Sequence, residues 1–186
     1  MVYELNQITK SICLAFNEAH LIYCITGGIA VSLMGEIRTT KDIDFIILLE
    51  ENQKESIIPI LDRAVKLIQS HEDVMVRHGI PIWRHNMLSR DRKKVISIDL
   101  ILANSDFLKR VLKRRREIRL LGIRTYLIAP EDLIILKLIS FRKQDELDIE
   151  NIIKSDETID WKYLKEQIDM MKLNRDFIEH LKETFV

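Results

Sequence analysis

The sequence predicts an α/β core followed by a helical C-terminal part, and three observations support this prediction. Short apolar runs alternate with stretches of helical periodicity over about the first 128 residues. Glycines and polar turn residues separate these runs. From Pro130 onward the pattern is helical, with breaks near residues 155–158 and near Asn174. We therefore expect a core over residues 1–128 and a helical region over residues 129–186 that packs on it.

The first half of the core is expected to alternate helices and strands. Apolar residues at helical spacing, such as Leu5, Ile8 and Ile12, indicate the first helix, and Gly35 is a suitable C-cap for a short second one. Pro59 is unfavourable inside a helix, so regular helix is expected only from about there. The expected elements are helix 3–19, strand 21–25, helix 29–34, strand 43–49 and amphipathic helix 53–70.

The second half of the core is expected to contain more strand. Strands over 80–85 and 95–103 are separated by turn residues at 89–91. Ser105 can cap a helix that runs to about Arg116, and a strand pair over 117–128 turns near Gly122. Pro130, followed by two acidic residues, is a strong helix start because both features suit the first turn.

Bulk composition excludes several classes of protein. The chain has 186 residues, of which 47% are apolar, enough for one hydrophobic core. Basic and acidic residues are equal at 29 each, so net charge does not indicate a nucleic-acid partner. Cys13 and Cys24 lie among apolar residues and are expected to be buried and reduced. No apolar run is long enough to span a bilayer and no signal peptide begins the chain, so we expect a cytoplasmic protein.

Asp42 and Asp44 are the strongest candidates for a metal site. They lie two residues apart at the start of a predicted strand, so both carboxylates leave the same face. Two carboxylates this close repel each other unless a cation lies between them. Carboxylate oxygens suit Mg²⁺ or Mn²⁺. The alternative is a solvated strand end.

Gly27 and Gly28 are candidates for binding phosphate. They lie between a predicted strand and a predicted helix, where backbone N–H groups can approach a ligand closely. Taken alone, such a pair is more often a simple turn. Arg38 either helps to hold phosphate or caps the preceding helix.

Asp99 is a third candidate acid. It lies inside a mostly apolar predicted strand, where a carboxylate is costly unless it is paired or bound to metal. Beside Asp42 and Asp44 it would complete a site for two metal ions, which activate a hydroxyl and stabilise departing pyrophosphate. The alternative is that Asp99 pairs with an arginine in the core.

These motifs resemble those of a known superfamily. The glycine pair, the thirteen residues after it and then Asp-Ile-Asp-Phe at residues 42–45 resemble the signature of the polymerase-β-like nucleotidyltransferases. Ile98-Asp99-Leu100 is similar to the strand that bears its third carboxylate. Residues 38–44 and 130–148 resemble an uncharacterised prokaryotic branch close to the AbiEii/MenT-like nucleotidyltransferases. The resemblance covers roughly residues 20–150.

The resemblance implies a nucleotidyltransferase fold, in which helices flank a mixed β-sheet and a helical part follows. It implies that Lys137 contacts the nucleotide phosphates and that Asp145 is a further polar site residue. The alternatives are a solvent-facing Lys137, and pairing of Asp145 and Asp148 with Arg142 and Lys143 at helical spacing.

The expected function is metal-dependent transfer of a nucleoside monophosphate from an NTP to a hydroxyl of an RNA end, a protein or a small molecule. Asp42, Asp44 and Asp99 would hold two Mg²⁺ or Mn²⁺ ions, and Asp99 would favour deprotonation of the nucleophile. The basic run 109–119 is either a solvated helix face or a contact for RNA. A toxin that modifies tRNA, with an antitoxin protein as partner, would use the same chemistry. The competing hypothesis is a non-catalytic nucleotide-binding module.

Overall fold

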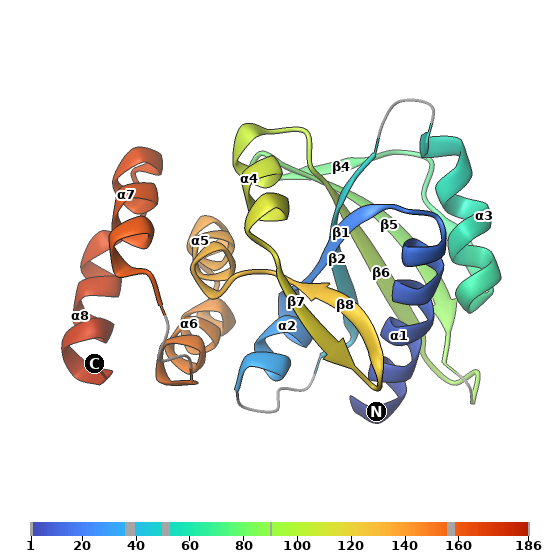
Figure 1. Ribbon diagram of the computed structural model, residues 1–186, viewed down its shortest axis with the longest axis horizontal. Coiled ribbons are helices and arrows are strands. Elements are labelled where there is room, and N and C mark those ends of the chain that lie inside the picture. The colour runs from blue at the N-terminus through green and yellow to red at the C-terminus, as the bar shows by residue number, and fades with distance from the viewer. Residues whose placement is uncertain (1, 36–39, 50–52, 90, 156–158, 186) are drawn as a thin grey trace. The chain divides into compact units, whose positions relative to one another are not determined.

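The computed structural model describes residues 2–35, 40–49, 53–89, 91–155 and 159–185 (Figure 1). The chain divides into two compact units. The first contains residues 1–29 and 39–128, and the second contains residues 30–38 and 129–186. Each unit is described by itself.

The first unit is built on a mixed eight-stranded sheet. Its strands are β1 Ile22–Thr26, β2 Asp42–Leu48, β3 Leu67–Ser70, β4 Met75–Arg77, β5 Ile80–Leu88, β6 Val95–Leu102, β7 Arg116–Leu120 and β8 Ile123–Leu127. Their order is β3-β5-β6-β2-β1-β8-β7, with β4 also paired to β5. The pairs β2–β6 and β1–β8 are parallel and the others antiparallel. The predicted fold class, a mixed sheet flanked by helices, is confirmed.

Helices cover both faces of this sheet. Figure 1 shows α1 (Val2–Glu18) and α3 (Lys54–Val65) on one face and α4 (Asp106–Arg114) on the other. The short helix α2 (Gly27–Met34) begins in the first unit and continues in the second. Ser105 caps α4 as predicted, because its hydroxyl accepts a hydrogen bond from the Leu108 N–H at 3.2 Å.

An aromatic cluster joins α1 to the centre of the sheet. The ring of Phe16 lies 5.1 Å from that of Tyr23 and 5.3 Å from that of Phe45, both edge to face. All three side chains are fully buried. The Tyr23 hydroxyl bonds to the Thr125 hydroxyl at 3.0 Å, and burial raises the pKa of Tyr23. The face of β1 and β2 that bears Tyr23 and Phe45 is therefore turned towards α1, and Asp42 and Asp44 alternate onto the other face.

The amphipathic helix expected over residues 53–70 begins at Lys54, close to the expected start, but ends earlier than expected. It ends at Val65, because Lys66 adopts a left-handed conformation (φ 55°) and its N–H bonds to the Asp62 carbonyl at 2.8 Å. Residues 67–70 instead form β3, which pairs with β5. The helix also begins before Pro59, which lies inside it. Burial of Ile57 on the same helix outweighs the one hydrogen bond that the proline removes.

The basic run was also expected to continue further as helix than it does. Helix α4 ends at Arg114, and residues from Arg116 onward form β7 at the edge of the sheet. The positive charges are therefore divided between a helix end and an edge strand. The predicted turn at Gly122 is present between β7 and β8, while β4 was not predicted.

Among the residues that the structure describes, the second unit contains four helices after residue 129, together with most of α2. They are α5 Pro130–Ser140, α6 Lys143–Ser155, α7 Trp161–Met171 and α8 Arg175–Phe185. The proline start of α5 and the break near Asn174 are as predicted. A further break, which was not predicted, occurs at Phe141, whose φ of 38° ends α5. None of the helices among the described residues is long and apolar enough to cross a membrane.

Candidate active site

Gly27 and Asp44 make the closest approach at the candidate site. Strand β1 ends at Thr26, which is paired with Asp44 of β2, and helix α2 begins at Gly27, two residues earlier than expected. Gly27 has a φ of 63°, and a Cβ added to it would lie 1.9 Å from Oδ2 of Asp44. Only glycine fits this position, because a side chain would need the space that the Asp44 carboxylate takes.

Asp42 and Asp44 leave the same face of β2. Between and after them, Ile43 and Phe45 are fully buried, and the ring of Phe45 packs on Phe16 of α1. Alternation along the strand therefore puts both carboxylates on the face turned away from α1. Both residues are half-buried, so they are reachable from solvent. This arrangement is the one that the spacing predicted.

Asp99 lies beside Asp44 in the sheet. Strands β2 and β6 are parallel, and their register pairs these two aspartates directly. Neighbours in register share a face, so the three acids selected from the sequence share one face of the sheet. Asp99 is 6% exposed, and is therefore the most enclosed of them.

Arg84 is a site residue that sequence reasoning missed. It lies on β5 in register with Asp99, and it donates from Nε to Oδ1 at 2.7 Å and from Nη2 to Oδ2 at 2.6 Å. This two-pronged ion pair corresponds to the alternative considered for Asp99 from the sequence, which was pairing with an arginine. The pKa of Arg84 is raised, chiefly by the hydrogen bonds that it donates to Asp99 and also by the charges of Asp99, Asp42 and Asp44. The signal in the sequence was a charged residue, Arg84, within the strand predicted over residues 80–85.

The carboxylates fit a divalent cation in part. Asp42 and Asp44 offer hard oxygen ligands on one face, next to a glycine that keeps the space open. Both oxygens of Asp99 accept hydrogen bonds from Arg84. Among the described residues, no group of three or more His, Cys, Asp or Glu side chains is arranged to hold a metal ion. The ligands available to a cation are therefore the carboxylates of Asp42 and Asp44. The third carboxylate, that of Asp99, lies beside them and is paired with Arg84.

The remaining candidates for binding nucleotide are differently placed. Gly28 follows Gly27 in the first turn of α2. Arg38 lies outside the described residues. Lys137 and Asp145 belong to the second unit, on α5 and α6.

Lys137 is buried in a cluster of charges. Its ammonium nitrogen lies 3.1 Å from Oδ1 of Asp145 and 2.6 Å from Oδ2 of Asp148. Lys137 is 6% exposed and both aspartates are fully buried, so the alternative of a solvent-facing lysine is wrong. Arg142 donates to Asp145 from Nε at 2.8 Å, as the helical-spacing alternative expected, whereas Asp148 pairs with Lys137.

Asp145 is strongly held as a carboxylate. Burial, the largest single influence, would raise its pKa, but hydrogen bonds from Arg142 and Ser140 and the charge of Lys137 together hold the pKa of Asp145 below its usual range. The ammonium of Lys137 thus has two carboxylate partners within α6.

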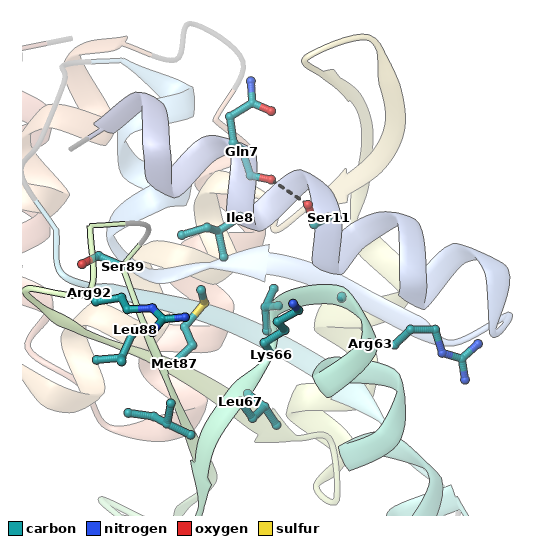
Figure 2. Close-up of a pocket in the computed structure, with 13 residues that line it drawn as sticks. Gln7, Ile8, Ser11, Arg63, Lys66, Leu67, Met87, Leu88, Ser89 and Arg92 are labelled. Atoms are coloured by element: carbon teal, nitrogen blue, oxygen red, sulfur yellow. Dashed lines mark hydrogen bonds between the residues drawn. The ribbon is translucent and has the colours of Figure 1, made fainter.

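A separate groove lies on the other face of the sheet (Figure 2). It has a volume of about 610 Å³ and lies among α1, the end of α3 and the end of β5. Met87 in its wall has the opposite alternation to Arg84, so the groove opens on the face that α1 covers. Arg63, Lys66 and Arg92 line it, and no acidic residue does among those that the structure describes. The groove is therefore distinct from the carboxylate site.

Residues 3–184 match the family described as nucleotidyltransferase of unknown function (DUF6036). The chain belongs to this family. It is a nucleotidyltransferase of the polymerase-β-like superfamily, as the glycine pair and the Asp-x-Asp motif predicted. No curated protein matches the sequence.

Solved structures show the same fold at low sequence identity. The first is an antigenic nucleotidyltransferase-like protein from Paracoccidioides brasiliensis (16% identity, TM-score 0.55, covering 95% of this chain and 92% of that one). The lincosamide antibiotic adenylyltransferase LnuA, bound to lincomycin, matches with 14% identity and a TM-score of 0.54 over 80% and 96%. The antibiotic-resistance factor ANT(2'')-Ia matches with 13% identity and a TM-score of 0.53 over 100% and 92%.

Proposed function

We propose that this nucleotidyltransferase moves a nucleoside monophosphate from an NTP to a hydroxyl group and releases pyrophosphate, with Mg²⁺ or Mn²⁺ held by Asp42 and Asp44. The main observation behind this proposal is that Asp42, Asp44 and Asp99 share one face of the sheet. Gly27, which has no side chain, leaves room for the Asp44 carboxylate on that face. A protein that only bound nucleotide would have no use for three acids on one face.

The glycine pair supplies the phosphate side of the proposed site. The first turn of α2 begins at Gly27 and Gly28. The positive end of the helix dipole favours the phosphates of an NTP there, and the glycines allow a ligand to approach the backbone closely. Arg38 and Lys137 are the proposed cationic contacts, and Asp145 is the further polar residue.

The acids divide the chemistry between them. A bound cation would neutralise charge on the transferring phosphate and on the departing pyrophosphate. Asp42 and Asp44 would hold it. Asp99, the more enclosed acid, would favour loss of the proton from the acceptor hydroxyl. Binding of two ions, as expected from the sequence, would require Asp99 as a ligand as well. Asp99 could act as a ligand only if its ion pair with Arg84 opened.

Three classes of acceptor remain to be compared. The likeness to a lincosamide adenylyltransferase puts a small-molecule hydroxyl first. An RNA end is second, because the basic run is divided between α4 and β7 and presents no single basic helix face. A protein hydroxyl is third. A toxin role with an antitoxin partner would follow only from an RNA acceptor.

The test is release of pyrophosphate and transfer of label from each α-labelled NTP, with Mg²⁺ or Mn²⁺ and one acceptor class at a time. Wild-type protein should transfer label, and Asp42→Ala/Asp44→Ala should lose at least about a thousandfold, since a metal supplies several kcal/mol of transition-state stabilisation. Asp73→Ala, at an exposed acid, is the matched control and should keep full activity. Binding of NTP with no transfer to any acceptor would instead support the non-catalytic module.

A further inference from the structure

Arg84 occupies the place at Asp99 that a second cation would need. Its guanidinium donates one hydrogen bond to each carboxylate oxygen, at 2.7 and 2.6 Å. The Asp99 side chain is only 8% exposed, so there is little access to it from solvent. A planar guanidinium matches a carboxylate in this two-pronged way, whereas a metal ion would have to displace it.

The charges of these four side chains balance with one divalent ion. Asp42, Asp44 and Asp99 contribute three negative charges and Arg84 contributes one positive charge. The remaining formal charge of minus two is neutralised by one Mg²⁺ or Mn²⁺. A second ion would bring a positive excess and would have to approach the guanidinium, which disfavours it further.

We propose that Arg84 is a positioning residue that takes the place of a second cation at Asp99, so that the nucleotide-free protein binds one divalent ion, at Asp42 and Asp44. The inference rests on the cation site of the proposed function. It changes the role of Asp99 from a metal ligand to an acid whose orientation an arginine holds.

The experiment counts bound Mn²⁺ by electron paramagnetic resonance of the free ion, without nucleotide. Wild-type protein should bind about one Mn²⁺ per chain, and Arg84→Gln should bind about two, because Asp99 becomes available as an oxygen ligand. In Arg84→Gln/Asp99→Asn the count should return to about one. Arg124→Gln, which removes an exposed ion pair with Glu117 in the same unit, is the matched control and should leave the count at that of the wild type.

The outcomes separate this inference from the proposed function. Two ions on the wild type, with no change in Arg84→Gln, would overturn the role of Arg84 and leave the proposed cation site intact. No bound Mn²⁺ in either protein would overturn the cation site and the inference with it. If circular dichroism shows that Arg84→Gln does not fold, the wild-type count alone decides: one ion, lost in Asp42→Ala/Asp44→Ala, supports the inference, and two ions overturn it.

Discussion

At the scale of single residues, Gly27 is the position with least freedom. Two independent requirements meet there, a left-handed backbone and the absence of a side chain next to Asp44. Either requirement alone would favour glycine, and together they make it necessary for the geometry of the acids.

Replacing Gly27 with alanine should therefore damage the site more than the fold. The new Cβ would displace the Asp44 carboxylate, and a displacement of about 1 Å can cost about a hundredfold in rate. Gly122→Ala is the matched control, because Gly122 also has a positive φ, 85°, but nothing lies within 4 Å of an added Cβ. Thermal unfolding should show a loss of about 1 kcal/mol for Gly122→Ala from the backbone alone, and a larger loss for Gly27→Ala because the Asp44 side chain must also move. Equal transferase activity in the two variants would contradict the assigned role of Gly27.

At the scale of elements, helices α5 and α6 are joined by buried charge. Lys137 on α5 lies against Asp145 and Asp148 on α6, and Arg142 in the connection closes over Asp145. A buried ion pair adds little net stability over apolar packing, but removal of one partner leaves the others uncompensated. Because α5 ends at Phe141, the chain can reverse direction, and Asp145 and Asp148 of α6 then lie next to Lys137 of α5.

Lys137→Met should strongly destabilise the second unit. It leaves two buried carboxylates without their shared cation, at a cost of about 3–5 kcal/mol in the free energy of unfolding. Lys154→Met is the control, because Lys154 pairs with Glu150 at an exposed i,i+4 position worth at most about 0.5 kcal/mol. Urea unfolding followed by circular dichroism measures both. A stable Lys137→Met that has lost affinity for NTP would favour the phosphate role over the structural one.

At the scale of the whole molecule, stability should depend on pH through His85. His85 lies on β5, on the same face of the sheet as Met87, and is fully buried. Its Nδ1 lies 3.0 Å from the Ser70 hydroxyl. Burial, followed by the nearby charge of His71, lowers the pKa of His85 to about 4, against an opposing effect of Asp99. A histidine that is neutral when folded binds its proton more readily once the chain unfolds.

The sign follows from linkage. Above the unfolded pKa of about 6.5, His85 is neutral in both states and does not lower the free energy of unfolding. As the pH falls from there towards the folded pKa of about 4, the unfolded chain binds a proton that the folded protein does not, and stability is lost. Over that window the free energy of unfolding should fall by about 1 kcal/mol per pH unit relative to His85→Gln. Trp83 fluorescence in a Trp161→Phe background reports on the first unit, since the Trp83 ring lies 4.7 Å from that of His85. Parallel pH profiles for the two proteins would remove His85 as the cause.

The elements with strong local signals, and the acids of the candidate site, could be predicted from the order of the amino acids. Helical spacing defined α1, Ser105 and Pro130 marked the starts of α4 and α5, and the Asp-x-Asp spacing put two carboxylates on one face. These features depend on neighbours in the chain, so periodicity and capping chemistry are enough to predict them.

The partners of the charged groups, by contrast, became known only from the fold. The ion pair of Arg84 with Asp99 requires the register of β5 against β6, and the charge cluster of Lys137 requires α6 to fold back on α5. Residues 67–70 became a strand because β5 offered a pairing edge, which outweighed their helical periodicity. Contacts between residues distant in sequence carry no local pattern, and for this reason the partner of Asp99 had to be found in the fold.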